Sequence, residues 1–275
     1  MEGGTVKVRA RGLTKQFQVE APGRDRTVRA LDAVSFDVHE GEFVALTGRS
    51  GCGKTTTLRI IMGLEQASSG TVEVGGRRVE RCGHDRGMVF QHAELLPWRS
   101  ALANVEFGLE VKGVAADERR RIAMRCLERV GLGQSVDRRP DQLSGGMKQR
   151  VGLARALAID PDVLLMDEPF GALDAQTRES MQAELIGLHE QTRKTVIFVT
   201  HDLDEAVLLA DRVFVFTPHG RLHETVDIRI PRPRGDPVAI RGAEEFQGKR
   251  YHIWSSLKAL DDHAARTADE VKPWK

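Results

Sequence analysis

The residues with the clearest chemical potential form one run, Gly48-Arg49-Ser50-Gly51-Cys52-Gly53-Lys54-Thr55, which matches the pattern G-x-x-x-x-G-K-[ST] in full. An apolar segment, Phe43–Thr47, precedes the run, and a helical pattern from Lys54 to Leu64 begins within it. Glycines let backbone N–H groups close around phosphate oxygens, and a helix start adds the positive end of its dipole. The pattern predicts a phosphate-binding loop in which Lys54 neutralises phosphate charge and the Thr55 hydroxyl ligates Mg²⁺.

An acidic pair, Asp167 and Glu168, follows the apolar run Val163–Met166. The four apolar residues predict a buried strand, and ligands of open α/β sheets bind at the carboxyl ends of such strands. Asp167 is therefore predicted to hold Mg²⁺, and Glu168 to accept a proton from an attacking water. Cys52 occupies a variable position of the loop, where we expect it to fill space rather than to act as a nucleophile.

The elements that must position these residues alternate between strand and helix. Period-two alternation predicts strands within residues 5–47, and helical character dominates from about Ala101 to Ala158. After that, apolar runs and helical segments alternate again, which is typical of βαβ units around a parallel sheet. We also expect a turn at Pro22–Asp25, a turn at Pro218–Gly220 between antiparallel strands, and a weakly helical, polar stretch over about 239–275.

Composition excludes several classes of protein. The 275 residues carry 41 Lys and Arg against 40 Asp and Glu, a net charge of +1, which argues against binding that depends on nucleic-acid phosphates. We find neither an apolar run long enough to span a bilayer nor the apolar core of a secretory signal. The three cysteines have no CxxC spacing, which indicates a reducing compartment and argues against a disulfide scaffold or zinc site.

A third element, Leu143-Ser144-Gly145-Gly146-Met147, lies between the loop and the acidic strand. Ser144, Gly145 and Gly146 are expected to open a helix whose first N–H groups face an anion. This run resembles the LSGGQ signature of the ATP-binding cassette (ABC) ATPases, which has the same place in their motif order. Met147 replaces the usual Gln and is only a weak acceptor, but the Ser and Gly positions are intact.

Further residues match other motifs of the ABC family. Gln91 corresponds to the Q-loop glutamine, Gly171-Ala172-Leu173-Asp174 to the D-loop, and His201 to the switch histidine. Phe17 stands where the family places an aromatic residue against adenine, and Val28 is a second candidate for contact with the base. Taken alone, a histidine at a strand end, such as His201, is more often a surface or capping residue, and Phe17 could be a core residue.

The resemblance implies an α/β fold, the P-loop NTPase fold of ABC nucleotide-binding domains. Its parts are a parallel-sheet RecA-like core, an N-terminal antiparallel β subdomain and an inserted α-helical subdomain. On this basis we expect an ABC ATPase domain over residues 5–230, with the helical subdomain at about 92–158, and a C-terminal tail over 231–275.

The resemblance also implies a set of site residues and the cofactors ATP and Mg²⁺. Glu168 would be the general base, His201 would hold the γ-phosphate and water, and Gln91 would sense the metal. Thr55, Gln91 and Asp167 are the predicted Mg²⁺ ligands. The predicted nucleotide-binding residues are Phe17, Gly48, Arg49, Ser50, Gly51, Cys52, Gly53, Lys54, Thr55, Thr56, Ser144, Gly145, Gly146 and Asp174.

The family architecture implies partners as well. Two copies would pair head to tail, each ATP lying between the phosphate loop of one and the signature helix of the other, with Asp174 at the interface. A separate transmembrane permease would supply the pore, which places the chain at the cytoplasmic face of the membrane as a peripheral subunit. Trp98 is expected to receive the permease, whereas Leu95 and Leu96 are either core residues or part of that contact.

The run Leu95-Leu96-Pro97-Trp98 and the short chain resemble importers of the nitrate, sulfonate and taurine group. The predicted function is therefore uptake of a small anion such as an aliphatic sulfonate, taurine or nitrate, with a solute-binding protein as an indirect partner. The alternatives are the ATPase of a lipid or lipoprotein extrusion complex and a soluble ABC ATPase of DNA repair or translation. The single cassette, the short insertion and the near-zero charge disfavour the soluble alternative, and no nucleic-acid partner is expected.

Overall fold

The computed structural model describes residues 4–19 and 26–270. The chain divides into two compact units: unit 1 combines Met1–Arg81 with Ile197–Lys275, and unit 2 comprises Cys82–Val196. Among the described residues, no helix is long and apolar enough to cross a lipid bilayer.

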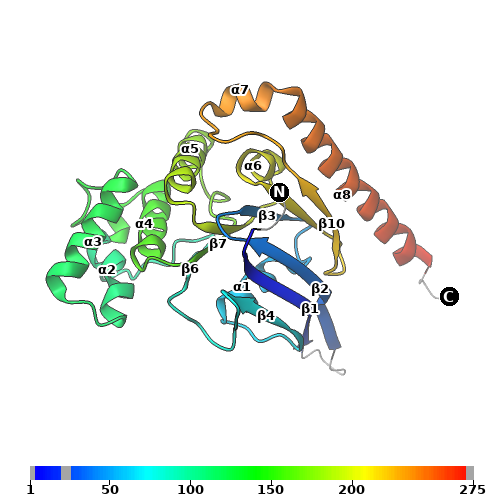
Figure 1. Ribbon diagram of the computed structural model, residues 1–275, viewed down its shortest axis with the longest axis horizontal. Coiled ribbons are helices and arrows are strands. Elements are labelled where there is room, and N and C mark those ends of the chain that lie inside the picture. Colours follow the sequence, from blue (N-terminus) through cyan, green and yellow to red (C-terminus); the bar gives the residue numbers. More distant parts are fainter. Residues whose placement is uncertain (1–3, 20–25, 271–275) are drawn as a thin grey trace. The chain divides into compact units, whose positions relative to one another are not determined.

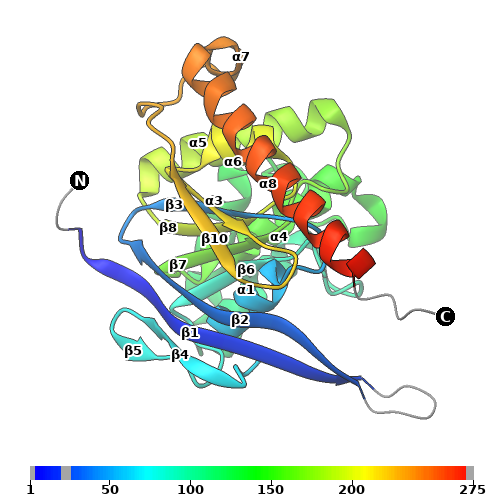
Figure 2. The ribbon, with the colours of Figure 1, turned by 90° about the vertical axis from the view of Figure 1, so that its right-hand side faces the viewer.

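An antiparallel sheet forms the N-terminal part of unit 1. Its strands are β1 (Val6–Val19), β2 (Arg26–His39), β4 (Ser69–Val74) and β5 (Arg77–Arg78), in the order β2-β1-β4-β5. The expected period-two strands are confirmed, because the side chains that alternate along β1 and β2 are buried on one face of the sheet. Figure 2 shows β1 and β2 as a long hairpin; the turn expected at Pro22–Asp25 lies outside the described residues.

A second set of strands in unit 1 leads to the phosphate loop. All five residues of β3 (Phe43–Thr47) are buried, and β3 pairs in parallel with β9 (Arg212–Phe216). On the far side of β9, β10 (Leu222–Asp227) is antiparallel, so the turn expected at Pro218–Gly220 is confirmed. On its other side β3 adjoins β8 (Thr195–Val199). Four of the five residues of β3 are apolar, which is typical of a strand covered on both faces.

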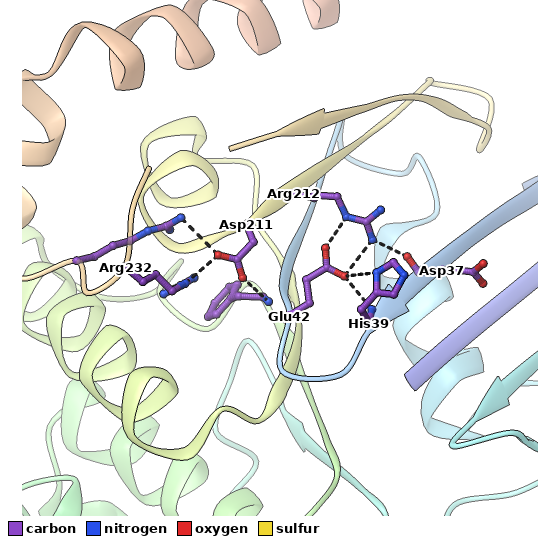
Figure 3. Close-up of polar contacts among 8 residues, drawn as sticks. Asp37, His39, Glu42, Asp211, Arg212 and Arg232 are labelled. Atoms are coloured by element: carbon purple, nitrogen blue, oxygen red, sulfur yellow. Dashed lines mark hydrogen bonds and ion pairs between the residues drawn. The ribbon is translucent and has the colours of Figure 1, made fainter. Parts of the chain in front are cut away.

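Two carboxylates fasten the beginning of β3 to its neighbours (Figure 3). The Asp211 carboxylate accepts the Phe43 backbone N–H at 2.9 Å and the Arg232 Nε–H at 2.8 Å. Glu42 pairs with the Arg212 guanidinium, which also donates to the Asp37 carbonyl at 2.6 Å. Because these contacts join segments far apart in sequence, they fix where the strand that carries the phosphate loop begins.

The C-terminal segment of unit 1 is more ordered than its sequence indicates. It forms α7 (Pro237–Gly242) and the long helix α8 (Glu244–Glu270), and both contact α6 (Leu203–Leu209). Figures 1 and 2 show α8 running alongside β10. The expectation of a weakly helical tail misses this helix, because its stability comes from burying Phe246 and Ile253 rather than from local propensity.

Unit 2 contains a cluster of helices and a pair of strands. Helices α2 (Ala101–Val111), α3 (Ala116–Arg129) and α4 (Gly145–Ala158) pack on one another (Figure 1), as the sequence predicts. The strands β6 (Arg86–Val89) and β7 (Val163–Asp167) pair in parallel, and α5 (Ala175–Thr192) follows β7. A short 3-10 turn, Pro140–Gln142, precedes the signature run.

Arg234 provides a test of how the C-terminal segment is held. Its side chain is buried and donates to the carbonyls of Leu208 and Ala210 at the end of α6, at 2.5 and 2.8 Å. Replacing Arg234 with Met removes a charged donor from two carbonyls, so we expect the free energy of unfolding to fall by about 3 kcal/mol, measured by urea titration. The control is Arg229→Met at an exposed position, and equal effects of the two changes would contradict this view of Arg234.

Candidate functional site

The phosphate loop of unit 1 joins β3 to α1 (Lys54–Met62) and is stabilised by its own lysine. Lys54 is 5% exposed, and its Nζ donates to the carbonyls of Gly48 at 2.8 Å and Arg49 at 2.9 Å. Gly53 has φ 94°, and a Cβ there would lie 2.4 Å from the Ala30 carbonyl oxygen, so only glycine fits. The loop therefore holds a positive charge at a helix start, which is the chemistry of an anion site.

Cys52 contributes packing to this loop. The thiol is buried, and burial raises its pKa above the ordinary value even though the Lys54 charge opposes the shift. A neutral, inaccessible thiol is a poor nucleophile. This agrees with the expectation that Cys52 fills space.

The remaining loop residues lie where the pattern predicts. Thr55 and Thr56 are half-buried in the first turn of α1, whereas Arg49 and Ser50 are exposed at the loop surface. Gly53 offers no side chain to cap α1, and no acidic residue lies in the first turn. The positive end of the helix dipole is therefore not neutralised by the first turn of α1 itself.

His201 lies between two well-anchored residues of unit 1. Thr200 is buried; its backbone N–H bonds to the Leu46 carbonyl at 3.2 Å and its hydroxyl to the Glu205 carboxylate at 2.6 Å. On the other side, the Asp202 side chain caps α6 by accepting from the backbone N–H groups of its first turn. The capping residue is thus Asp202, and His201 is presented at the surface from a fixed backbone.

Phe17 and Val28 face each other across the β1–β2 hairpin. Phe17 is 36% exposed and Val28 is 40% exposed, so neither is a core residue. The Lys15 ammonium lies 4.9 Å from the centre of the Phe17 ring. The pair forms an exposed apolar platform of the kind on which a flat heterocycle can stack.

The acidic residues of unit 2 lie at the end of β7, as predicted. All five residues of β7 are buried, including Asp167. Glu168 follows with φ 44°, a left-handed conformation that is uncommon for a residue with a side chain and that clusters at functional sites. Its carbonyl accepts the Gly171 N–H at 3.1 Å, which makes a tight turn out of the strand.

Gln91 and Glu168 lie on the same side of this turn. A Cβ added at Gly171 would be 3.6 Å from the Gln91 Nε2 and 3.8 Å from the Glu168 Oε2. Gln91 is exposed in the loop after β6, and Gln149 of α4 donates to the neighbouring Phe90 carbonyl at 2.8 Å. Within unit 2, the structure therefore brings Gln91 and Glu168 together, two of the three predicted catalytic side chains. The hydrogen bond from Gln149 links the loop that carries Gln91 to α4.

The signature run opens α4 as predicted. Ser144 is the N-cap residue, its hydroxyl accepts the Met147 N–H at 3.3 Å, and the helix begins at Gly145. Ser144, Gly146 and Met147 line an open pocket of about 720 Å³ together with residues of α3, of the loop after α3 and of α5. The start of α4 therefore borders a space that a ligand can enter.

A chain of contacts that sequence reasoning missed links this run to the D-loop. Asp174 caps α5, accepting the Thr177 N–H at 3.0 Å and the Thr177 hydroxyl at 2.7 Å. These hydrogen bonds hold the pKa of the Asp174 carboxyl below its ordinary value. Gly146 packs so closely on Thr177 that a Cβ there would lie 2.4 Å from the Thr177 Cγ2. The sequence pattern Asp-x-x-Thr at Asp174–Thr177 could have predicted this helix cap.

The segment around Trp98 presents an apolar surface on unit 2. Trp98 is 69% exposed, and Leu95 and Leu96 are half-buried, so the leucines serve in part as packing. Asn104, fully buried on α2, holds this loop by bonding to the backbone N–H and carbonyl of Leu96 and to the carbonyls of Arg99 and Ser100. The exposed ring is therefore carried on a rigid loop.

Three features now stand together: a glycine loop that holds a lysine between a parallel strand and a helix, a strand that ends in acidic residues, and a helix that begins with glycines after a serine cap. They define a P-loop nucleotide triphosphatase of the cassette type. Comparison with known proteins agrees: the family model described as ABC transporter matches residues 31–171. The chain belongs to the ABC transporter ATP-binding family and is an ATP hydrolase of that class, with its P-loop ABC fold.

Individual relatives sharpen this assignment. The taurine import ATP-binding protein TauB of Rhizobium johnstonii is 46% identical over 241 residues, which cover 86% of this chain and 92% of TauB. The nitrate import ATP-binding protein NrtD of Synechococcus elongatus is 46% identical over 209 residues, covering 74% and 76%. The dimeric cassette MJ0796, solved with ADP and Pi after hydrolysis, is 34% identical with a TM-score of 0.73, covering 82% of this chain and 100% of MJ0796.

Gly146→Ala tests the contact between the signature run and Thr177. The added methyl group overpacks this contact and should lower the stability of the protein by about 1–3 kcal/mol, seen as a lower thermal midpoint. Gly145→Ala is the matched control, because a Cβ there meets nothing within 4 Å. Adding Thr177→Ser, which removes the Cγ2 and keeps the hydroxyl, should restore the midpoint; failure of this rescue would disprove the contact.

Proposed function

We propose that this protein is the ATP-hydrolysing subunit of an importer that takes up a small anion through a separate membrane permease. The observation that carries the proposal is the presence in one chain of the Lys54-filled phosphate loop and the Ser144-capped signature helix. Similarity over most of the chain to taurine and nitrate import proteins supports the direction of transport and the class of solute.

In this proposal the phosphate loop of unit 1 binds ATP. Lys54, which now lies against the Gly48 and Arg49 carbonyls, exchanges these partners for phosphate oxygens when the nucleotide enters. Backbone N–H groups of Gly48–Thr56 complete the cradle, and the exposed Phe17 platform receives the adenine.

The donor set also suits Mg²⁺. Thr55, Gln91 and Asp167 offer hydroxyl, amide and carboxylate oxygens, the hard ligands that this ion prefers. Among the described residues, no cluster of three or more His, Cys, Asp or Glu side chains is placed to hold a metal ion. When bound, Mg²⁺ neutralises charge on the phosphates; the protein side chains orient it.

Glu168 is proposed as the general base that accepts a proton from the attacking water. Its left-handed backbone and the tight turn to Gly171 hold the carboxylate at the end of a buried strand. His201, presented from a fixed backbone, holds the γ-phosphate and the water. Gln91, linked to α4 through Gln149, relays the presence of the nucleotide to the helices of unit 2.

The signature helix is proposed to act in a second copy of the chain. The similar cassette MJ0796 is a dimer, which supports a head-to-tail homodimer with one ATP between each phosphate loop and a partner's Ser144–Gly146. Because Asp174 supports Gly146 through Thr177, the interface residue and the signature run are mechanically connected. ATP then stabilises the closed pair, and hydrolysis releases it.

The membrane partner is proposed to dock on the Trp98 segment. An exposed aromatic ring on a rigid loop has the properties of an interface anchor. Attachment to a permease would hold the protein at the cytoplasmic face of the membrane. A solute-binding protein outside would select the anion, such as an aliphatic sulfonate, taurine or nitrate.

Glu168→Gln tests the assignment of the base. The amide cannot accept the proton, so ATP turnover should fall at least about a hundredfold while ATP still binds, and sedimentation should show an ATP-dependent dimer. The control is Glu179→Gln on the exposed side of α5, which should hydrolyse ATP like the original protein. Near-normal turnover in Glu168→Gln would remove Glu168 from this role.

Trp98→Ala tests the docking surface. Removing the ring should lower assembly with the permease about tenfold or more and leave the affinity for ATP unchanged, because a central aromatic anchor contributes about 2 kcal/mol or more to an interface. Tyr251→Ala, at a ring that is similarly exposed on unit 1, is the control. Transport and assembly unchanged in Trp98→Ala would refute docking at this surface.

A further inference from the structure

The C-terminal helix α8 is fastened to unit 1 along its length. Phe246 and Ile253 are fully buried against the unit. The Arg250 guanidinium pairs with Asp204 in the first turn of α6 at 2.5 Å, and the His252 Nε2 lies 3.0 Å from the Glu224 carboxylate of β10. These contacts hold the first half of α8 beside β10 (Figure 2), and the second half continues from there to the C-terminal end of the helix.

At that end, α8 reaches the phosphate loop. The Asp261 Oδ1 lies 3.4 Å from the Nε of Arg49, the second residue of the loop. This oxygen is inaccessible to water and makes no hydrogen bond within the described residues, so the contact is an ion pair without a close hydrogen bond. The Arg49 side chain is 59% exposed, whereas its carbonyl holds Lys54. The residue thus links α8 to the lysine that meets the phosphates.

We propose that Asp261 is a positioning residue that holds the Arg49 side chain away from the nucleotide and lowers the affinity of the loop for ATP. The inference rests on the proposed role of the loop in ATP binding. A carboxylate beside an anion site opposes binding of a polyphosphate and competes with it for the same guanidinium. By reciprocity, ATP that recruits Arg49 must weaken the hold on the end of α8. The end of α8 thereby responds to ATP bound at the phosphate loop.

The first readout is the affinity of the full-length chain for ATP with Mg²⁺, measured by calorimetry. Asp261→Asn should tighten binding by about two- to fivefold at low salt, and the gain should shrink as salt screens the charge. Asp262→Asn, at an exposed carboxylate on the same helix, is the matched control and should have a smaller effect. In an Arg49→Gln background, Asp261→Asn should lose most of its effect.

The second readout is hydrogen exchange of residues 257–263 in the full-length chain. Saturating ATP should speed exchange there in the original protein, and in Asp261→Asn exchange should be fast with and without ATP. Equal affinities of the Asp261 and Asp262 variants, or exchange that ATP does not change, would overturn the inference. Lys54→Ala separates the two claims: if it leaves ATP affinity intact, the proposed function itself fails, whereas if it abolishes binding while Asp261→Asn has no effect, only the role of Asp261 fails.

Discussion

The structure depends on holding a lysine ammonium inside a loop of glycines. Lys54 is almost inaccessible, and two carbonyls of its own loop bind it. Burying a cation is costly unless it is hydrogen-bonded, so the loop must keep its shape. Much of unit 1 serves that end: β3 is buried, Asp211 fixes its first residue, and the Ala30 carbonyl leaves room only for a glycine before the lysine.

In unit 2, the corresponding feature is the start of α4, which is held in shape by packing and capping. A helix start can bind an anion only if its cap leaves space, and here Ser144 caps α4 while the glycines after it stay bare. Thr177 supports Gly146 from behind, and Asp174 holds Thr177 by two hydrogen bonds. The signature run and the D-loop therefore pack as one assembly, so a substitution in one should alter the conformation of the other.

The local parts of this account could be predicted from the sequence. The phosphate loop, the buried strand before Asp167 and the capped helix at Ser144 follow from spacing and residue type over a few positions. The burial of Arg234, the length of α8 and the Asp261–Arg49 pair could not be predicted. Each depends on partners more than twenty residues away, and a charged residue in a polar segment gives no local sign that it will be buried. The exposure of Phe17 could not be predicted either, because it depends on how β1 and β2 pair, which sets Phe17 opposite Val28.

The central claim is that the phosphate loop of one chain and the signature helix of a second chain bind the same ATP. The most direct test is the position of the γ-phosphate in a structure of the Glu168→Gln chain with ATP and Mg²⁺. We expect each γ-phosphate to contact Lys54 of one chain and Ser144 of the other. A nucleotide held wholly by one chain, with Ser144 of both chains facing solvent, would contradict it.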